Sequence, residues 1–540
     1  MNTLKNIVKS ALLGCALFLL PTQSSAQSIL ELIPGSKRMI MDENSNKLRL
    51  IGNVNFLYQG NKMYCDSAHY FEKKQIVHAY GRVHINKRDT LNLFCDSLHY
   101  NGKTKLATLW GNVRLRDNEY KLTTDELEYD AKRSQAVYKK GGRVESILSR
   151  EVLTSRVGYF HPESKNFFFS QNVDYRGKDI KMTTDTLRYR YSEKKTYFYG
   201  PTNIETKGTK IFCEAGWYNT ESEEGELRQN AQITRKNEII RGDTLLYLPK
   251  EGTNIGKGNV FYSDSTQKMS FQGDYALISD SLHYTFLTGH ALAVKELKDD
   301  TMYVHADTLY TYKEDSVEYM RAYQKAAIYS TKFQCIADSI SYAPNEDKME
   351  LFRDPIVWSN GAELKGDSME LQLTDSILQK VLIKNKSSVI MSVDDEKYFN
   401  QIGGKEIIAY FKDNDLYQTK VNGNAVTIFY PEEETKTDTT VVKERQGMNR
   451  LFSSTLRIDI DSNEVSGITY LEEPDGVFYP IDQIDQKDQF IQGFDWKDAL
   501  RPRSPEGMLE DVDLEALNPK ESDTEIDEEE DEILQKIELR

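Results

Sequence analysis

The chain repeats one short motif at a nearly constant interval, and this repetition limits what it can fold into. The motif is a small residue, Asp, any residue, Leu or a similar residue, any residue and Tyr. Its acidic position recurs every 29 to 33 residues, at Asp66, Asp96, Asp125, Asp185, Glu214, Asp243, Asp274, Asp307, Asp338 and Asp367, with Ser155 in a degenerate copy. Such a period is typical of stacked repeats that bury their apolar faces against one another.

A glycine lies halfway between successive motifs. Gly111 follows Asp96 by 15 residues, and Gly200 follows Asp185 by the same distance. Polar turn sequences, such as residues 101–104, separate each pair, and turn residues between alternating apolar stretches are hairpin signals. Each repeat is therefore predicted to be two antiparallel strands of about a dozen residues. The Asp of one strand should lie beside the Gly of the next.

The apolar residues around each Asp indicate a bend. They lie three positions before it and two and four positions after it. Because alternate residues of a strand face opposite sides, the odd spacing requires a bend or bulge at the Asp if both sets face one core. Glycine tolerates the backbone angles that the neighbouring strand then needs. The sequence predicts an all-β fold, an elongated, bent β-jellyroll of about 12 stacked hairpins around one apolar interior.

The same alternation predicts which side chains line this interior. They are Leu98, Tyr100, Leu127, Tyr129, Leu187, Tyr189, Leu245 and Tyr247. Their neighbours His99, Glu128, Arg188 and Leu246 should face outward.

The chain outside the repeats has three parts. Residues 1–26 are predicted to be a signal peptide, with Lys5 and Lys9 before an apolar run, although Cys15 could instead mark a lipoprotein cleavage site. The repeat domain spans residues 37–430, and residues 431–500 are predicted to be a linker followed by further strands or a cap. Residues 501–540 form an acidic tail that is expected to be largely disordered, with 15 acidic and 3 basic residues from Pro505 onward.

No pattern in the chain indicates catalysis. We find no Ser-His-Asp spacing, no phosphate-binding glycine loop and no zinc-type cluster, so we predict neither an enzyme nor a cofactor, although a cryptic active site stays an alternative. The row of acidic residues could bind Ca²⁺, but one Asp per repeat supplies too few oxygens, so we predict no metal site. The near-neutral repeat domain provides no basic surface for nucleic acid.

Four cysteines remain after the signal peptide: Cys65, Cys95, Cys213 and Cys335. They occupy one slot of the repeat, and equivalent slots lie two strands apart, about 9.5 Å. A disulfide needs Cα atoms within about 7 Å. We therefore predict free, buried thiols, with disulfides as the alternative.

The export signal, the Asp-x-Leu-x-Tyr hairpins and the Gly-Asn-Val returns at residues 52–54, 111–113 and 258–260 together resemble the OstA/LptA superfamily. The likeness is greatest to longer OstA-like proteins of the Bacteroidetes type. The resemblance implies a periplasmic protein, or one associated with the outer membrane, that acts in lipopolysaccharide transport and outer-membrane assembly. Its jellyroll interior would shield lipid A acyl chains. LptA itself is much shorter and has no long acidic tail, and we expect no C-terminal barrel like that of LptD in this sequence.

Two classes of function follow, a lipid-conducting bridge and a ligand-free structural scaffold of the envelope. A conduit should leave an open apolar groove, whereas a scaffold should fill its interior with large side chains. A bridge would also need partners, and the resemblance implies LptC-like and LptD-like jellyroll proteins. Unpaired edge strands template strand addition, so the first and last repeat strands are predicted to dock these partners through Val54, Phe56, Val426 and Ile428.

Overall fold

The structure is a computed structural model that describes residues 31–42, 46–58, 61–87, 91–161, 166–314, 317–374, 377–412, 415–436, 441–461 and 464–508. The predicted signal peptide and residues 509–540 of the predicted tail lie outside these residues. The chain divides into two compact units, unit 1 with residues 1–164 and unit 2 with residues 165–540.

Unit 1 is a stack of antiparallel strands in which β3 to β8 each pair with the strands before and after them in the sequence. Its elements are β1 (Glu31–Ile33), β2 (Arg38–Asp42), β3 (Lys47–Tyr58), β4 (Asn61–Phe71), the 3-10 helix η1 (Glu72–Lys74), β5 (Ile76–Lys87), β6 (Leu91–Asn101), β7 (Leu106–Arg116), β8 (Tyr120–Asp130), β9 (Gln135–Tyr138), β10 (Gly142–Ser146), β11 (Val152–Ser155) and β12 (Val157–His161).

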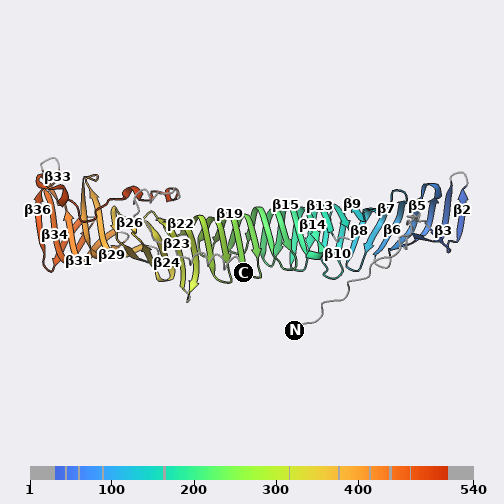
Figure 1. Cartoon of the computed structure of the whole chain (residues 1–540), viewed down its shortest axis with the longest axis horizontal. Helices are drawn as coiled ribbons and strands as arrows, with labels where there is room; N and C mark the ends of the chain where they lie inside the picture. Colours follow the sequence, from blue (N-terminus) through green and yellow to red (C-terminus); the bar gives the residue numbers. More distant parts are fainter. Residues whose placement is uncertain are drawn as a thin grey trace, which may run out of the picture. The chain divides into compact units, whose positions relative to one another are not determined.

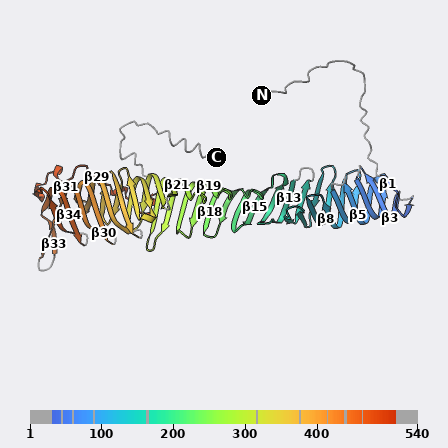
Figure 2. The same ribbon diagram turned by 90° about the horizontal axis from the view of Figure 1, so that it is seen from below.

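Unit 2 has the same hairpin pattern, and Figure 1 shows its strands side by side. Figure 2 shows the same ribbon from below. The first part contains β13 (Asn166–Arg176), β14 (Ile180–Arg190), η2 (Tyr191–Glu193), β15 (Lys195–Thr206), β16 (Thr209–Asn219), β17 (Gly225–Thr234), β18 (Glu238–Leu248), β19 (Thr253–Asp264), β20 (Met269–Ser279), β21 (Tyr284–Glu296), β22 (Thr301–Glu314), β23 (Val317–Tyr329) and β24 (Phe333–Ala343).

The second part of unit 2 contains η3 (Pro344–Glu346), β25 (Lys348–Phe352), β26 (Ile356–Ser359), β27 (Ala362–Lys365), β28 (Ser368–Thr374), β29 (Ile377–Val393), β30 (Tyr398–Lys412), β31 (Asp415–Phe429), β32 (Glu432–Lys436), β33 (Val441–Arg445), β34 (Gly447–Asp461), β35 (Glu464–Leu471), β36 (Asp475–Pro480), η4 (Ile481–Gln483), η5 (Gln486–Asp488), η6 (Asp498–Leu500) and η7 (Glu506–Met508). The pair β32–β33 forms a small separate sheet.

Each long strand bends at the acidic residue of the motif. Asp96 on β6 lies beside Gly111 on β7, and the pairing register shifts between Phe94 and Ser97. Gly111 has a φ of +74°, and a Cβ at this position would overlap the Asp96 carboxylate. The register shifts in the same way beside Gly200. The predicted bend shared by Asp and Gly is therefore confirmed, and it takes the form of a β-bulge.

The carboxylate at the bend binds the side chain that follows the glycine on the next strand. The pairs are Arg82–Asp66 (2.6 Å), Asn112–Asp96 (2.8 Å), Asn259–Asp243 (2.9 Å) and His290–Asp274 (2.8 Å). The hydrogen bond from Arg82 also lowers the pKa of Asp66. The acidic row thus ties neighbouring strands together at the bend.

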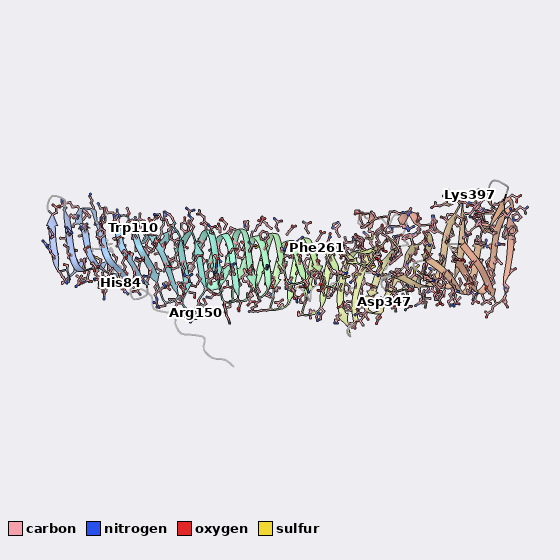
Figure 3. The ribbon with its side chains drawn as sticks, turned by 180° about the vertical axis from the view of Figure 1, so that it is seen from behind. His84, Trp110, Arg150, Phe261, Asp347 and Lys397 are labelled. Carbon is pink, nitrogen blue, oxygen red and sulfur yellow. The ribbon has the colours of Figure 1, made fainter. Side chains whose placement is uncertain are left out.

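The bend divides every repeat into two arms that enclose one interior. We call arm A the part formed by segments such as residues 91–95 and 113–116, and arm B the part formed by residues 97–101 and 106–110. Leu93 on arm A and Leu98 on arm B both point inward and are buried. His84 and Trp110 lie on the outer faces of arms A and B (Figure 3).

Residues 481–508, which we call the C-terminal strap, cover the outer face of arm A in unit 2 (Figure 1). Beneath the strap, one residue from each strand forms a row of directly paired neighbours from β24 to β34. The row consists of Gln334, Trp358, Glu363, Ile390, Gln401, Ile428 and Arg450. These strands are therefore covered on both faces.

Three buried polar side chains of the row hold the strap. The bonds are Ile491 N–H to Gln401 Oε1 (2.9 Å), Gln401 Nε2 to Gln489 O (2.8 Å), Lys497 N–H to Glu363 Oε2 (3.1 Å) and Arg501 Nε to Gln334 Oε1 (2.7 Å). At the end of the strap, Met508 packs on Leu292 and Ala327. Residues 501–508 are thus packed on the sheet, which corrects the prediction that a disordered tail begins at residue 501.

The geometry of the bend predicts that adding a Cβ atom at its glycine lowers the stability of the protein. Gly111→Ala should destabilise the protein by about 2 kcal/mol, because it forces a left-handed backbone on alanine and displaces Asp96. Gly467→Ala is the matched control, since Gly467 lies on β35 with open space around it. Denaturant unfolding measures both changes, and equal losses in the two variants would contradict the role of the bend.

The strap predicts a second effect. Glu363→Ala removes the acceptor of the Lys497 N–H and the Trp358 indole N–H, so it should cost about 3 kcal/mol. Hydrogen exchange of residues 489–501 should accelerate. Glu350→Ala, at an exposed pair with Lys348, is the control and should cost about 0.5 kcal/mol or less. Unchanged exchange in the Glu363 variant would show that the bonds do not hold the strap.

Candidate functional site

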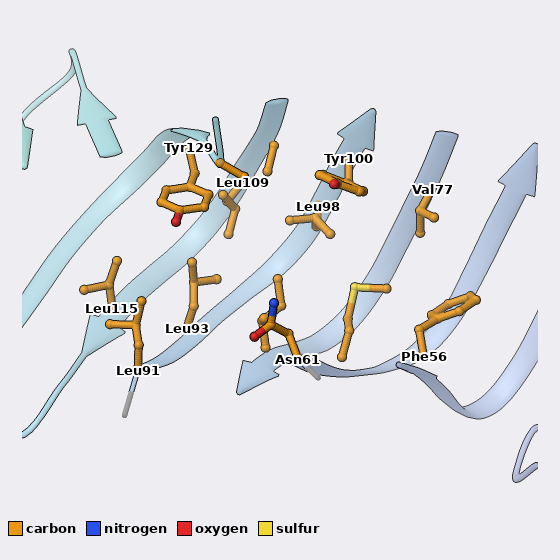
Figure 4. A pocket seen from close by; sticks show the side chains of 14 residues that line it. Phe56, Asn61, Val77, Leu91, Leu93, Leu98, Tyr100, Leu109, Leu115 and Tyr129 are labelled. Carbon is orange, nitrogen blue, oxygen red and sulfur yellow. The ribbon is translucent and has the colours of Figure 1, made fainter. Parts of the chain in front are cut away.

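An apolar cavity of about 230 Å³ lies between the two arms of unit 1 (Figure 4). Its wall comes from β3 to β8 and the residue after β8. The lining residues are Phe56, Asn61, Met63, Val77, Ile85, Leu91, Leu93, Leu98, Tyr100, Ala107, Leu109, Leu115, Tyr129 and Ala131. Apart from Asn61 and two tyrosine hydroxyls, these side chains offer only hydrocarbon and sulfur surface.

Small side chains on the returning strands keep this cavity open. Tyr100 pairs with Val77 on β5 and Ala107 on β7, and Tyr129 pairs with Ala107. Neither tyrosine is fully buried, and both line the cavity. The space that larger neighbours would fill therefore remains as a groove.

The structure places the eight predicted interior residues on the inward face of arm B, in two different settings. Leu98, Tyr100 and Tyr129 line the unit 1 cavity, and Leu127 is fully buried next to them. In unit 2, Leu187, Tyr189, Leu245 and Tyr247 are all buried. Their predicted role in lipid binding stays a prediction.

The motif-based prediction missed most of the cavity wall. Val77, Ala107 and Leu109 lie on the returning half of each hairpin, and Leu93 and Leu115 lie on arm A. The returning strands carry this signal in their alternation, because Ala107, Leu109, Val113 and Leu115 lie an even number of positions apart on β7 and all face the interior.

A second cavity, of about 430 Å³, lies in unit 2. Met391 on β29, Ile402 on β30 and Phe429 on β31 line its arm A side, and Leu416 and Ile460 line its arm B side. Arg445 stands at its border and forms an ion pair with Asp394 at 2.6 Å. The lining is mixed: aliphatic side chains such as Val389 and Ile468 stand beside the polar residues Ser392, Asn400, Gln401, Thr427 and Glu432.

The surroundings of the cysteines and of the acidic residues indicate that these side chains serve the fold. Cys65, Cys95, Cys213 and Cys335 are free and buried, and burial raises the pKa of the Cys65 thiol to about 12. Within the part of the chain that the structure describes, no three His, Cys, Asp or Glu side chains gather in a way that could hold a metal ion. The described residues also contain no helix of the length and hydropathy needed to cross a membrane.

The predicted docking residues do not lie at edges, so that prediction is wrong. Val54 and Phe56 belong to β3, which pairs with β4 on one side and with β1 and β2 on the other. Val426 and Ile428 belong to β31, which pairs with both β30 and β34. Residues 31–42 and 447–480 form strands outside the predicted first and last repeat strands, so the edges lie farther out.

The outermost strands expose apolar side chains. In unit 1, β2 exposes Met39 and Met41 to 55% and 65%. In unit 2, β36 exposes Val477 and Phe478 to 52% and 51%. Among the described residues, β2 pairs with β3 and β36 pairs with β34, each along one side.

Bent antiparallel hairpins around an apolar groove define a repeat-type β-jellyroll. Residues 33–185 match the family described as OstA-like protein, in agreement with the resemblance that the motifs indicated. The matched segment contains every residue that lines the unit 1 cavity.

One similar solved structure is LptH from Pseudomonas aeruginosa, described as the LptA homologous periplasmic component of the conserved lipopolysaccharide transport device. The two chains are 12% identical, and the match covers 26% of this chain and 80% of LptH. The TM-score of this match is 0.14. The sequence matches none of the curated proteins with which it was compared.

Proposed function

We propose that this protein is a periplasmic component of lipopolysaccharide transport or outer-membrane assembly, and that its groove shields lipid acyl chains. The open apolar cavity of unit 1 carries the proposal, because it lies wholly within the OstA-like segment. Moving one methylene group from water into such a cavity makes the free energy of binding more favourable by about 0.8 kcal/mol. The wall offers no nucleophile beside a base, so the proposed role is binding rather than catalysis.

The outermost strands support a bridging role. Exposed backbone edges accept an added strand, and exposed apolar side chains beside them provide further contact area. We propose that β2 and β36 dock homologous jellyroll partners of the LptC-like and LptD-like kind, in place of the inner strands predicted from the repeats.

A ligand-free scaffold is the second candidate, and one observation favours it. The interior residues Leu187, Tyr189, Leu245 and Tyr247 of unit 2 are at most 5% exposed, as expected for a filled core.

Lipid binding in unit 1 can be tested by photocrosslinking in cells. A photoreactive phenylalanine at position 100 replaces an aromatic residue that lines the cavity, so it should form adducts with lipopolysaccharide after irradiation. Position 99 is the control, because the side chain of His99, next to Tyr100 on β6, faces the outer surface. Ala107→Phe should reduce the adduct at position 100 by filling the cavity. Equal signals at positions 99 and 100, or none at 100, would contradict the proposal.

Edge docking can be tested with a charge on the edge strand. Met41→Lys should reduce binding of purified LptC-like or LptD-like jellyroll proteins to the full chain by about tenfold, because lysine on an edge opposes strand addition. Phe478→Lys tests β36 in the same way. Thr108→Lys adds the same positive charge within β7, which is paired on both sides, and serves as the control for the change of net charge. If neither edge variant alters the binding of any such partner, the bridging role is wrong.

A further inference from the structure

The tyrosine position of the motif is open to a cavity in unit 1 but is closed off in unit 2. The tyrosine that ends the motif lines an open cavity at Tyr100 and Tyr129 in unit 1. In unit 2 it is closed off, and Tyr189, Tyr218 and Tyr247 are 5%, 1% and 4% exposed. The repeat therefore does not fix whether the groove is open.

Aromatic rings close the groove in the first strands of unit 2. Tyr175 on arm A and Tyr189 on arm B meet across the interior, with ring centroids 6.4 Å apart. Phe167 packs on Tyr189 at 6.2 Å, and Tyr262 stacks on Phe271 at 5.9 Å. All five rings are less than 10% exposed. Close-packed side chains of this size leave no room for an alkyl chain.

Polar groups add to this closure. Thr206 and Thr209, at the ends of β15 and β16, are 4% and 8% exposed on the inward side. Asn254 occupies the slot that Val77 and Ala107 hold in unit 1, and it is fully buried. Its amide atoms have no hydrogen-bond partner among the described residues. Contact with an alkyl chain would leave such groups unsatisfied, which disfavours lipid here.

Unit 1 contains a similar closure outside its cavity. Tyr138 on β9 is 3% exposed, and its ring packs against Gly142 and Gly158, where any side chain would overlap it. The Tyr138 hydroxyl bonds to Ser155 at 2.7 Å, and burial raises the pKa of this tyrosine to about 12. Ser155 is the degenerate copy of the motif, so the irregular repeat accommodates a large ring.

We infer that the groove is interrupted: strands β13 to β20 are sealed, and acyl chains bind separately in the unit 1 cavity and in the cavity of β29 to β35. The inference rests on the proposed function and adds where lipid binds. The second cavity, at about 430 Å³, is the larger of the two, and its aliphatic residues, such as Ile402, Leu416 and Ile460, can contact an alkyl chain while its polar residues face a more polar part of the same ligand class. Lipid does not slide through the sealed strands unless their rings move.

Photocrosslinking at three interior positions of the full chain tests the interruption. Positions 100, 189 and 429 all carry aromatic residues, so a photoreactive phenylalanine changes each site little. Irradiation in cells should yield lipopolysaccharide adducts at 100 and 429, and an adduct about tenfold weaker at 189. Adding Tyr175→Ala to the position 189 protein should raise its adduct, because the substitution opens the groove beside it. Thermal unfolding of each variant confirms that it is folded.

The outcomes separate the two proposals. Equal adducts at all three positions would overturn the interruption and leave the lipid-binding function intact. An adduct at 100 without one at 429 would overturn the second binding site. Adducts at none of the positions would overturn the proposed function itself.

Discussion

The bulge at each acidic residue is the constraint on which the rest of the structure depends. A strand that crossed the stack without it would point its apolar residues inward in one half and outward in the other. On β6 the alternation reverses at the bend, since Leu93 and Leu98 lie five positions apart and both face the interior, while the extra residue beside the left-handed Gly111 keeps Leu109 and Leu115 of β7 on that same interior. The neighbouring Asp96 accepts a hydrogen bond from Asn112 and fixes both strands at that height. Two arms and one groove follow from this repeated contact.

The frame and the contents of the groove are set by different residues. The Asp–Gly pairs lie at the bend, whereas the depth of the groove depends on the side chains that face each other between the arms. Val77 and Ala107 leave space beside Tyr100, while Phe167 and Tyr175 fill it beside Tyr189. A repeat of this kind can therefore alternate between binding and sealed segments without any change in its backbone.

Local patterns in the sequence predict the frame well. The period, the bend and the inward residues of arm B all depend on neighbours within one hairpin, and the structure has them as predicted. The strap escaped prediction because its contacts join distant residues: Ile491 binds Gln401, 90 positions away, and Lys497 binds Glu363, 134 positions away. The first docking edge was predicted on the wrong strand, because β1 and β2 pair with β3 and do not carry the motif. The openness of the groove depends on contacts across the arms, which no single motif encodes.

The strap explains why the alternation of polar and apolar residues is weak in the strands of unit 2 that it covers. Strand β26 is buried at every position, because its inward side chains face the interior and its outward side chains face the strap. Alternation between polar and apolar residues is lost wherever a strand is covered on both faces. The same arrangement supports the cavity: Val389 and Ile402 form part of its wall, while Ile390, the neighbour of Val389 on β29, lies in the row under the strap. A wall held from behind by buried hydrogen bonds keeps its shape without ligand, and a preformed cavity loses less free energy to ordering when it binds.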